Sequence, residues 1–294
     1  MYIDLHTHST CSDGTYTPQQ IAEETGGKGI NPFSITDHDN IMAYDEPLNC
    51  ANDQVLIPGV EISAEFSKGT LHILGYGIDT TNQELRHTLD ELQQFRLNRN
   101  KKMLEKMKTL GFDISMEELL IEAKGEIIGR PHFANLMYSK GYVSSYQDAF
   151  DRYLTKGAPL YMDKKRLSPE DSIRLITQAG GTPVMAHPYQ TKREDEELTN
   201  LVEQLREMGL MGIEAFYSLH SQEMIEEYLG YADRYGLLVT AGSDFHGGNK
   251  PTIGLGINAP DKWIKPFLET IMERGNLSDK HRQKLKELIF RSVR

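Results

Sequence analysis

Cysteines and long apolar runs are scarce in this chain. Cys11 and Cys50 are the only cysteines in 294 residues, which disfavours a disulfide scaffold and predicts a reducing, cytoplasmic environment. No apolar run approaches the ~20 residues of a membrane-spanning helix. The amino terminus also lacks the basic-then-apolar pattern of a signal peptide. We therefore expect no membrane association.

Basic residues are also fewer than acidic ones. The chain has 32 lysines and arginines against 43 acidic residues, which gives a formal net charge of −11. This balance argues against binding of long duplex nucleic acid, whose phosphates attract basic surfaces. A small phosphorylated substrate stays compatible with it, provided that bound cations supply positive charge locally.

The chain contains short apolar segments that mostly alternate with amphipathic helices. Strands are expected at residues 2–5, 32–36, 55–62, 71–76, 183–187, 212–216 and 237–240. Helices are expected at 17–27, 168–180, 194–208, 221–235 and, as a basic tail, 277–294. This alternation is typical of a parallel α/β barrel, in which functional side chains lie at the carboxyl ends of strands.

The region between residues 81 and 167 has a different pattern. Apolar residues at helical spacing predict a long helix over 85–110 that stops at Gly111, followed by shorter helices at 116–123, 131–140 and 145–154. We predict a helical insertion or cap at 81–167, between barrel segments 1–80 and 168–294. The alternative is an unrelated helical domain on a linker.

Residues that bind metals recur at the ends of the predicted strands. His6 and His8 follow the first strand two residues apart, so their imidazoles project from one face. Imidazole is the commonest metal ligand in proteins. The later members of this set are Asp37, His38, Glu61, His72, His187, Glu214, Asp244 and His246.

These residues can be divided into candidate groups. The first joins His6, His8, Glu61 and Asp244; Glu61 could bridge to a second ion held by His72 and His187; and Asp13, His38 and His246 could hold a third. Mixed nitrogen and oxygen ligands suit Zn, Mn or Fe. Two or three such cations would clamp a phosphate and lower the pKa of a bound water.

A second notable stretch is Gly129-Arg130-Pro131-His132. Pro131 suits the first turn of a helix and would place Arg130 and His132 beside exposed backbone N–H groups, an anion-binding arrangement. Arginine adds two-point contact with phosphate oxygens. The alternative is a surface arginine beside a proline that starts a helix. His220, just after a predicted strand, is expected to border the site.

The motifs together resemble the polymerase-and-histidinol-phosphatase (PHP) family of metal-dependent phosphoesterases. The matching segments are residues 4–9, 36–39, 59–63, 71–76, 129–132, 186–188 and 243–246. The resemblance implies a distorted (β/α)7 barrel with a site for two or three divalent metal ions. By this resemblance, the expected metal ligands are His6, His8, Asp13, His38, Glu61, His72, His187, Asp244 and His246. Asp13 stands where some members carry a histidine.

The resemblance also indicates a substrate. The Gly-Arg-Pro-His stretch is most similar to the branch that includes 3′,5′-nucleoside bisphosphate phosphatases and ribonucleases directed at 5′ ends. We expect hydrolysis of a phosphate monoester of a small nucleotide or of the 5′ end of a short oligonucleotide. Asp244, His187 and Arg130 are assigned to catalysis, and Arg130, His132 and His220 to substrate binding.

Several alternatives stay open at this point. The proton donor to the leaving oxygen could be a water on the metal, His187 or His220. A histidinol-phosphate-type phosphatase is the nearest rival function. A metal-stabilised binding module without activity is a rival of another class, and ligands alone do not separate phosphate esters from amide-type bonds.

Overall fold

The computed structural model describes residues 1–51, 53–123, 128–163 and 165–291 as a mixed α/β fold. The strands are β1 (Tyr2–Ile3), β2 (Gly59–Ser63), β3 (His72–Tyr76), β4 (Thr182–Met185), β5 (Gly212–Tyr217), β6 (Leu238–Gly242) and β7 (Ile257–Asn258). The α-helices are α1 (Pro18–Gly27), α2 (Gln83–Thr109), α3 (Met116–Ala123), α4 (Arg130–Ser139), α5 (Tyr146–Ala149), α6 (Pro169–Gln178), α7 (Asp195–Glu207), α8 (Gln222–Tyr235), α9 (Asp261–Arg274) and α10 (Asp279–Arg291). Shorter helical turns are η1 (Met42–Tyr44), η2 (Phe150–Leu154, a π-helix), η3 (Pro188–Thr191) and η4 (Gly247–Asn249).

The chain divides into two compact units. The first comprises Met1–Leu89 and Arg166–Arg294, and the second comprises Asp90–Lys165. Helix α2 runs through the boundary between residues 89 and 90, whereas the predicted boundary at residue 81 falls just before this helix. No helix in the described residues combines the length and apolar character needed to cross a membrane.

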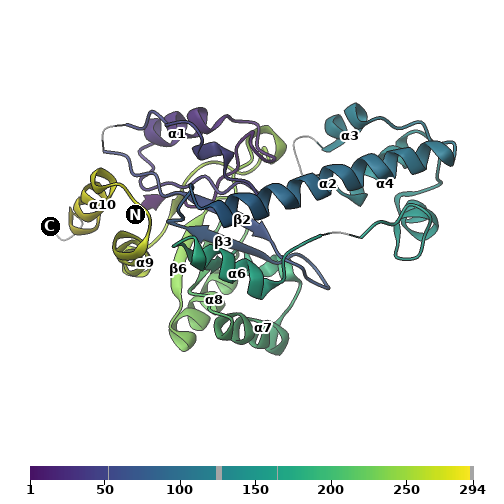
Figure 1. Cartoon of the computed structure of the whole chain (residues 1–294). Helices are drawn as coiled ribbons and strands as arrows, with labels where there is room; N and C mark the ends of the chain where they lie inside the picture. The colour runs from purple at the N-terminus through teal and green to yellow at the C-terminus, as the bar shows by residue number, and fades with distance from the viewer. Residues whose placement is uncertain (52, 124–127, 164, 292–294) are drawn as a thin grey trace. The chain divides into compact units, whose positions relative to one another are not determined.

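The first unit contains a five-stranded sheet with the order β2-β3-β4-β5-β6 (Figure 1). Strands β4, β5 and β6 are parallel, whereas β3 is antiparallel to both β2 and β4. The expectation of a wholly parallel arrangement is therefore wrong at β3. Only residues 64–71 connect β2 to β3, and a parallel crossover needs about a dozen residues or more. No closed sheet is found in the described part of the chain.

The predicted strand at 32–36 is also absent as a regular strand. Phe33 instead forms isolated parallel bridges to Asp4 on one side and Leu56 on the other. Pro32 has no backbone N–H to donate, which interrupts regular pairing at this point. The apolar character that suggested a strand is explained by burial, because Phe33 and Ile35 are fully enclosed in the core.

Most of the predicted helices are confirmed. Helix α1 begins with the expected capping box, in which Thr17 and Gln20 exchange hydrogen bonds between side chain and backbone. The helix predicted at 145–154 is α5 followed by the π-turn η2. The tail forms α10, and residues 292–294 of that prediction lie outside the described residues. Helix α9 is not among the predicted elements; it contains Pro266, a residue that argues against a helix interior.

Each unit has its own apolar core. In the first unit, α6 lies against β3 and β4, α8 against β5 and β6, and α9 against β6, while α10 packs on α9 (Figure 1). In the second unit, apolar side chains from α2, α3 and α4 meet in a separate core, which includes Met103, Met107, Leu119, Phe133 and Met137. Burial of apolar area in each core supplies the driving force for that unit to fold.

The Asp4 carboxylate fastens the amino-terminal segment to the loop that follows β6. Asp4 is fully buried, and its oxygens accept hydrogen bonds from the Ser243 N–H (2.9 Å), the Ser243 hydroxyl (2.6 Å) and the Gly256 N–H (2.8 Å). Asp4 and Ser243 are 239 residues apart in the sequence. This carboxylate therefore fixes where the residues just after β1 lie relative to those just after β6.

We expect Asp4→Ala to lower the free energy of unfolding by about 3 kcal/mol, because it leaves buried N–H donors without an acceptor. Chemical denaturation monitored by circular dichroism measures this loss. Asp233→Ala, which removes an exposed carboxylate on α8, is the matched control and should change stability little. Equal stability of the two variants would show that Asp4 does not fasten these segments.

Candidate metal centre

Nine buried or nearly buried side chains of the first unit converge in one cluster. They are His6, His8, Asp13, His38, Glu61, His72, His187, Asp244 and His246, and each has a ring nitrogen or carboxylate oxygen within 3.6 Å of another member. We call this set the His/Asp/Glu cluster. It contains all nine residues that the sequence proposed as metal ligands.

The strands explain how the cluster assembles. His187 follows β4, and Asp244 and His246 follow β6, so they lie where parallel strands present their carboxyl ends. His72 is instead the first residue of β3. Because β3 runs antiparallel to its neighbours, its amino end lies at the edge where β4 ends. The antiparallel strand thus brings His72 to the cluster from the opposite direction.

Glu61 lies at the centre of the cluster. Its Oε1 is 2.8 Å from His72 Nδ1 and 3.0 Å from His187 Nε2. Its Oε2 is 3.0 Å from His38 Nδ1, 3.2 Å from His8 Nε2 and 3.3 Å from His6 Nε2. The Glu61 side chain is fully buried, so one carboxylate faces five imidazoles without solvent between them.

Several of these buried atoms have no hydrogen-bond partner within the described residues. They include Glu61 Oε2 and the Nδ1 atoms of His8, His38 and His187. Buried polar atoms in native proteins are nearly always satisfied, because leaving them unpaired costs free energy. Glu61 Oε2 in particular lies 3.0 to 3.3 Å from three ring nitrogens without hydrogen-bond alignment. The arrangement therefore fits divalent cations, which would satisfy several lone pairs at once.

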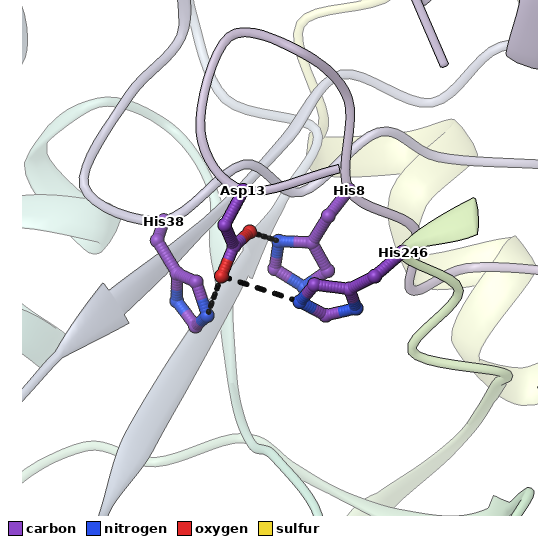
Figure 2. A group of neighbouring side chains, drawn as sticks. All are labelled: His8, Asp13, His38 and His246. Atoms are coloured by element: carbon purple, nitrogen blue, oxygen red, sulfur yellow. Dashed lines mark ion pairs between the residues drawn. The ribbon is translucent and has the colours of Figure 1, made fainter. Parts of the chain in front are cut away.

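Asp13 organises one part of the cluster. Its Oδ1 is 3.3 Å from His8 Nδ1, and its Oδ2 is 3.4 Å from His38 Nε2 and 3.3 Å from His246 Nε2. Figure 2 shows the Asp13 carboxylate between these three imidazoles, which come from three separate segments of the chain. These four side chains together could hold one ion. His6, His8 and Glu61, and His38, Glu61 and His72, form two further groups of ligand-competent atoms.

Asp244 uses its two oxygens differently. Oδ1 faces the cluster, at 3.2 Å from His8 Nε2 and 3.4 Å from His246 Nδ1. Oδ2 accepts hydrogen bonds from the Tyr217 hydroxyl (2.8 Å) and the Lys250 ammonium (2.7 Å). Sequence reasoning missed Tyr217 and Lys250. Tyr217 could have been found as the last residue of β5, whereas Lys250 carried no signal beyond its charge near His246.

One carboxylate outside the cluster, that of Glu214, contacts two of its histidines. Glu214 Oε1 is 3.0 Å from His6 Nδ1, and Glu214 Oε2 accepts a hydrogen bond from the His187 backbone N–H at 2.9 Å. Sequence reasoning placed Glu214 at a strand end but gave it no role. A carboxylate on one ring nitrogen fixes the tautomer and directs the other nitrogen to the metal. Glu214 therefore leaves His6 Nε2 to face Glu61 and Asp244.

The charge states of the carboxylates also suit cations. Burial alone would raise the pKa of Glu61, Asp13 and Asp244, but the surrounding imidazoles hold all three pKa values well below their usual range. Burial lowers the pKa of His72 to about 4, against the pull of Glu61. At neutral pH the carboxylates are ionised and His72 is neutral, the forms that bind metals. Burial alone would lower the pKa of His6, but Glu214, Glu61 and Asp244 raise it to about 10, so a cation that binds His6 would displace a proton.

The backbone is strained at two members of the cluster. His187 has φ +21° and Asp244 has φ +59°, in the left-handed region that side chains with a Cβ rarely adopt. Such strain costs on the order of 1–3 kcal/mol and is concentrated at functional sites. The Asp244 N–H donates to the His6 carbonyl at 2.8 Å, which holds this conformation in place.

Close approach of the backbone is required at Gly242. A Cβ at this position would lie 2.2 Å from the His6 Cβ and 2.8 Å from Glu214 Oε1. Glycine is therefore needed for His6 to occupy its position beside Glu214.

Two of the remaining predicted site residues belong to the second unit. Arg130 begins α4 in the second unit, where its guanidinium donates to the Leu154 carbonyl (3.1 Å) and lies 5.2 Å from the Tyr161 ring centre. His132 Nδ1 accepts a hydrogen bond from the Gly129 N–H and closes the start of that helix. The predicted helix start is thus confirmed to within one residue.

His220 lies in the first unit, just after β5. Its Nδ1 is 2.9 Å from the Ala215 carbonyl oxygen, which can only accept, so this nitrogen carries the proton. Burial lowers the pKa of His220, and its ring contacts Tyr217, whose ring centre is 4.9 Å away. His220 is therefore a neutral imidazole whose Nε2 can accept a hydrogen bond.

Comparisons with known proteins agree with this geometry. The model of the PHP domain matches residues 4–162. A 3′,5′-nucleoside bisphosphate phosphatase of Chromobacterium violaceum is 32% identical over 250 residues, which cover 83% of this chain and 87% of that protein. A 5′-3′ exoribonuclease of Haemophilus influenzae is 29% identical over 245 residues, with 83% and 89% of the two chains covered.

Solved structures show the same similarity. An amidohydrolase from Chromobacterium violaceum, with bound sulfate and no metal, has a TM-score of 0.72 at 30% identity and covers 91% of this chain and 95% of its own. A protein from Bifidobacterium adolescentis assigned as a metal-dependent phosphoesterase has a TM-score of 0.68 at 30% identity, with 92% and 96% covered. The chain therefore belongs to the PHP domain family and is a metal-dependent phosphoesterase.

We expect Gly242→Ala to weaken Mn²⁺ binding by roughly tenfold or more, because the added methyl group displaces His6 from Glu214. Gly230→Ala is the matched control, since a Cβ at Gly230 in α8 meets nothing within 4 Å. Metal content after dialysis against a fixed Mn²⁺ concentration measures the difference, and circular dichroism verifies folding. Full metal content in folded Gly242→Ala would contradict the assignment of His6.

Proposed function

We propose that this chain hydrolyses a phosphate monoester of a small nucleotide, such as a 3′,5′-nucleoside bisphosphate, or acts at the 5′ end of a short oligonucleotide. The observation that carries the proposal is the His/Asp/Glu cluster, in which Glu61 Oε2 is buried against three imidazoles and has no hydrogen-bond partner in the described residues. The names of the relatives support the substrate class, because one is a nucleoside bisphosphate phosphatase and another a 5′-3′ exoribonuclease.

The nine residues of the cluster would hold two or three divalent cations of Mn, Zn or Fe. When bound, such cations supply the charge that neutralises phosphate oxygens and lower the pKa of a coordinated water. Glu61 is suited to face two of them, because each of its oxygens approaches a different set of imidazoles. Glu214 would keep His6 in the tautomer that presents Nε2 to the cluster.

We also propose that the first unit is a distorted (β/α)7 barrel. Its support is a series of backbone contacts outside the regular strands. Bridges join Asp4 to Phe33, Phe33 to Leu56, and His38 to Glu61, and Thr7 to Phe245 near the end of β6. These contacts connect β6 to the segment after β1, that segment to residues 33–38, and residues 33–38 to the segment of β2. The strands β2, β3, β4, β5 and β6 form the five-stranded sheet.

The roles of the remaining residues follow from their hydrogen bonds. The His220 Nδ1 is committed to the Ala215 carbonyl, and its buried Nε2 has no hydrogen-bond partner in the described residues. We infer that Nε2 is the atom through which neutral His220 would accept a hydrogen bond from the substrate. That commitment disfavours His220 as the proton donor to the leaving oxygen. His187 and a water on the metal stay the candidates for that proton transfer, and Asp244 is assigned to catalysis as a ligand beside the reacting phosphate.

Arg130 and His132 of the second unit are proposed to bind the phosphate. The support is their place in the first turn of α4, where backbone N–H groups and the helix dipole favour anions. The guanidinium would add charge stabilisation as the phosphoryl group is transferred.

Phosphate release from a panel of phosphorylated metabolites tests the proposed function. We expect release from 3′,5′-nucleoside bisphosphates in the presence of Mn²⁺, loss of activity with a chelator, and recovery when Mn²⁺ is restored. His8→Ala and Asp244→Ala should abolish turnover while circular dichroism shows a retained fold. Faster release from histidinol phosphate than from every nucleotide would favour the rival phosphatase, and no release from any member would favour a binding module.

We expect Arg130→Ala to raise KM for the preferred nucleotide and to lower kcat, by roughly tenfold or more in kcat/KM, with Mn²⁺ content unchanged. Arg152→Ala is the control, because Arg152 lies in the same unit but pairs with the surface residue Asp148. Steady-state kinetics on metal-loaded protein measure the effect. Wild-type kinetics in Arg130→Ala would remove Arg130 from the site.

A further inference from the structure

Lys250 is a cation at the edge of the His/Asp/Glu cluster and is not one of its nine members. Its Nζ lies 2.7 Å from Asp244 Oδ2. The Lys250 side chain is 31% exposed, whereas the Asp244 side chain is 4% exposed. The ammonium group therefore lies between the buried cluster and solvent, where a substrate from solution can reach it.

The hydrogen bonds of Lys250 are incomplete. An ammonium group has three N–H donors and no acceptor. Asp244 is its one hydrogen-bond acceptor within the residues that the structure describes. Two N–H donors are therefore available to water or to an anion beside Asp244.

The loop that carries Lys250 is fixed in place. It follows β6 and η4, and it is tied to the loop that carries Asp13: the Gly248 N–H donates to Thr15 Oγ1, and the Asn249 side chain donates to the Asp13 carbonyl, each at 2.8 Å. The two loops are thus joined near the cluster, and Lys250 is held there rather than extended freely into solvent.

Tyr217 allows Lys250 a second partner. The Tyr217 hydroxyl donates to the same Asp244 oxygen at 2.8 Å and is buried. Asp244 therefore keeps its orientation through Tyr217 when the ammonium also contacts another group. Cations held by the cluster would draw the charge of Asp244 toward Oδ1 and leave more of the Lys250 charge for a second anion.

We propose that Lys250 binds a non-bridging oxygen of the substrate phosphate beside Asp244, and that Tyr217 is the positioning residue for that carboxylate. This inference rests on the proposed function, since it assumes a phosphate in the site. It adds a phosphate-binding cation from the first unit, on the same loop as the candidate ligands Asp244 and His246.

The test measures binding of inorganic phosphate to the full chain loaded with Mn²⁺, by titration calorimetry without turnover. Lys250→Met should weaken phosphate binding by roughly tenfold or more with Mn²⁺ content unchanged, as expected for loss of one charge-assisted hydrogen bond. Lys250→Arg should restore most of the affinity. Lys265→Met is the matched control, because Lys265 is a partly exposed lysine that pairs with Asp261 away from the cluster.

Two results would overturn the proposal. One is wild-type phosphate affinity in Mn²⁺-loaded Lys250→Met. The other is lost Mn²⁺ with unchanged phosphate affinity in the loaded fraction, which would make Lys250 a positioning residue for Asp244 only. If Lys250→Met does not fold, Lys250→Gln takes its place in the same titration.

Tyr217→Phe separates the two roles. It should lower Mn²⁺ affinity, because Asp244 loses an orienting donor, while phosphate affinity of the fully loaded protein stays within about threefold of wild type. The titration is independent of catalysis. A chain that binds phosphate through Lys250 but releases none from any nucleotide would refute the proposed function and leave this inference standing.

Discussion

The burial of Glu61 among imidazoles is the constraint on which the structure of the first unit depends. Five histidine nitrogens lie within 3.3 Å of its two oxygens, and the carboxylate is fully enclosed. A lone ionised carboxylate would be costly in such a place, and its pKa is kept low only because the imidazoles surround it. Several separate segments must therefore pack so that these nitrogens surround Glu61. The resulting arrangement is suited to binding divalent cations.

Two further buried carboxylates hold these segments in position by accepting hydrogen bonds. Asp4 fastens the segment before His6 to the loop of Asp244, and Glu214 holds His6 and the backbone of His187. These carboxylates do not belong to the cluster, yet each orients a residue that does. An active site of this kind consists of an inner set of ligands and an outer set of acceptors, and loss of the outer set would loosen the inner one.

Asp244 shows how a single residue connects the buried cluster with solvent. One oxygen faces the histidines, and the other faces Tyr217 and Lys250. Its backbone is held at a positive φ by a hydrogen bond to the carbonyl of His6. The strain is tolerated because neighbouring segments hold the residue from several sides, and its result is a carboxylate with two distinct environments.

The sequence by itself indicated most of the helices and the metal-binding side chains of the site, but not helix α9. Thr17 and Gln20 predict the start of helix α1 through their capping box. The nine cluster residues are recognisable because metal-binding side chains recur beside apolar segments. The short connection from β2 already disfavours a parallel β3, and the expectation of a parallel barrel did not take it into account. The isolated bridges of Phe33 were seen only in the tertiary structure. Lys250 and the roles of Tyr217 and Glu214 also required the tertiary structure. Their function comes from contacts with residues distant in sequence, and local periodicity and spacing carry no information about such contacts.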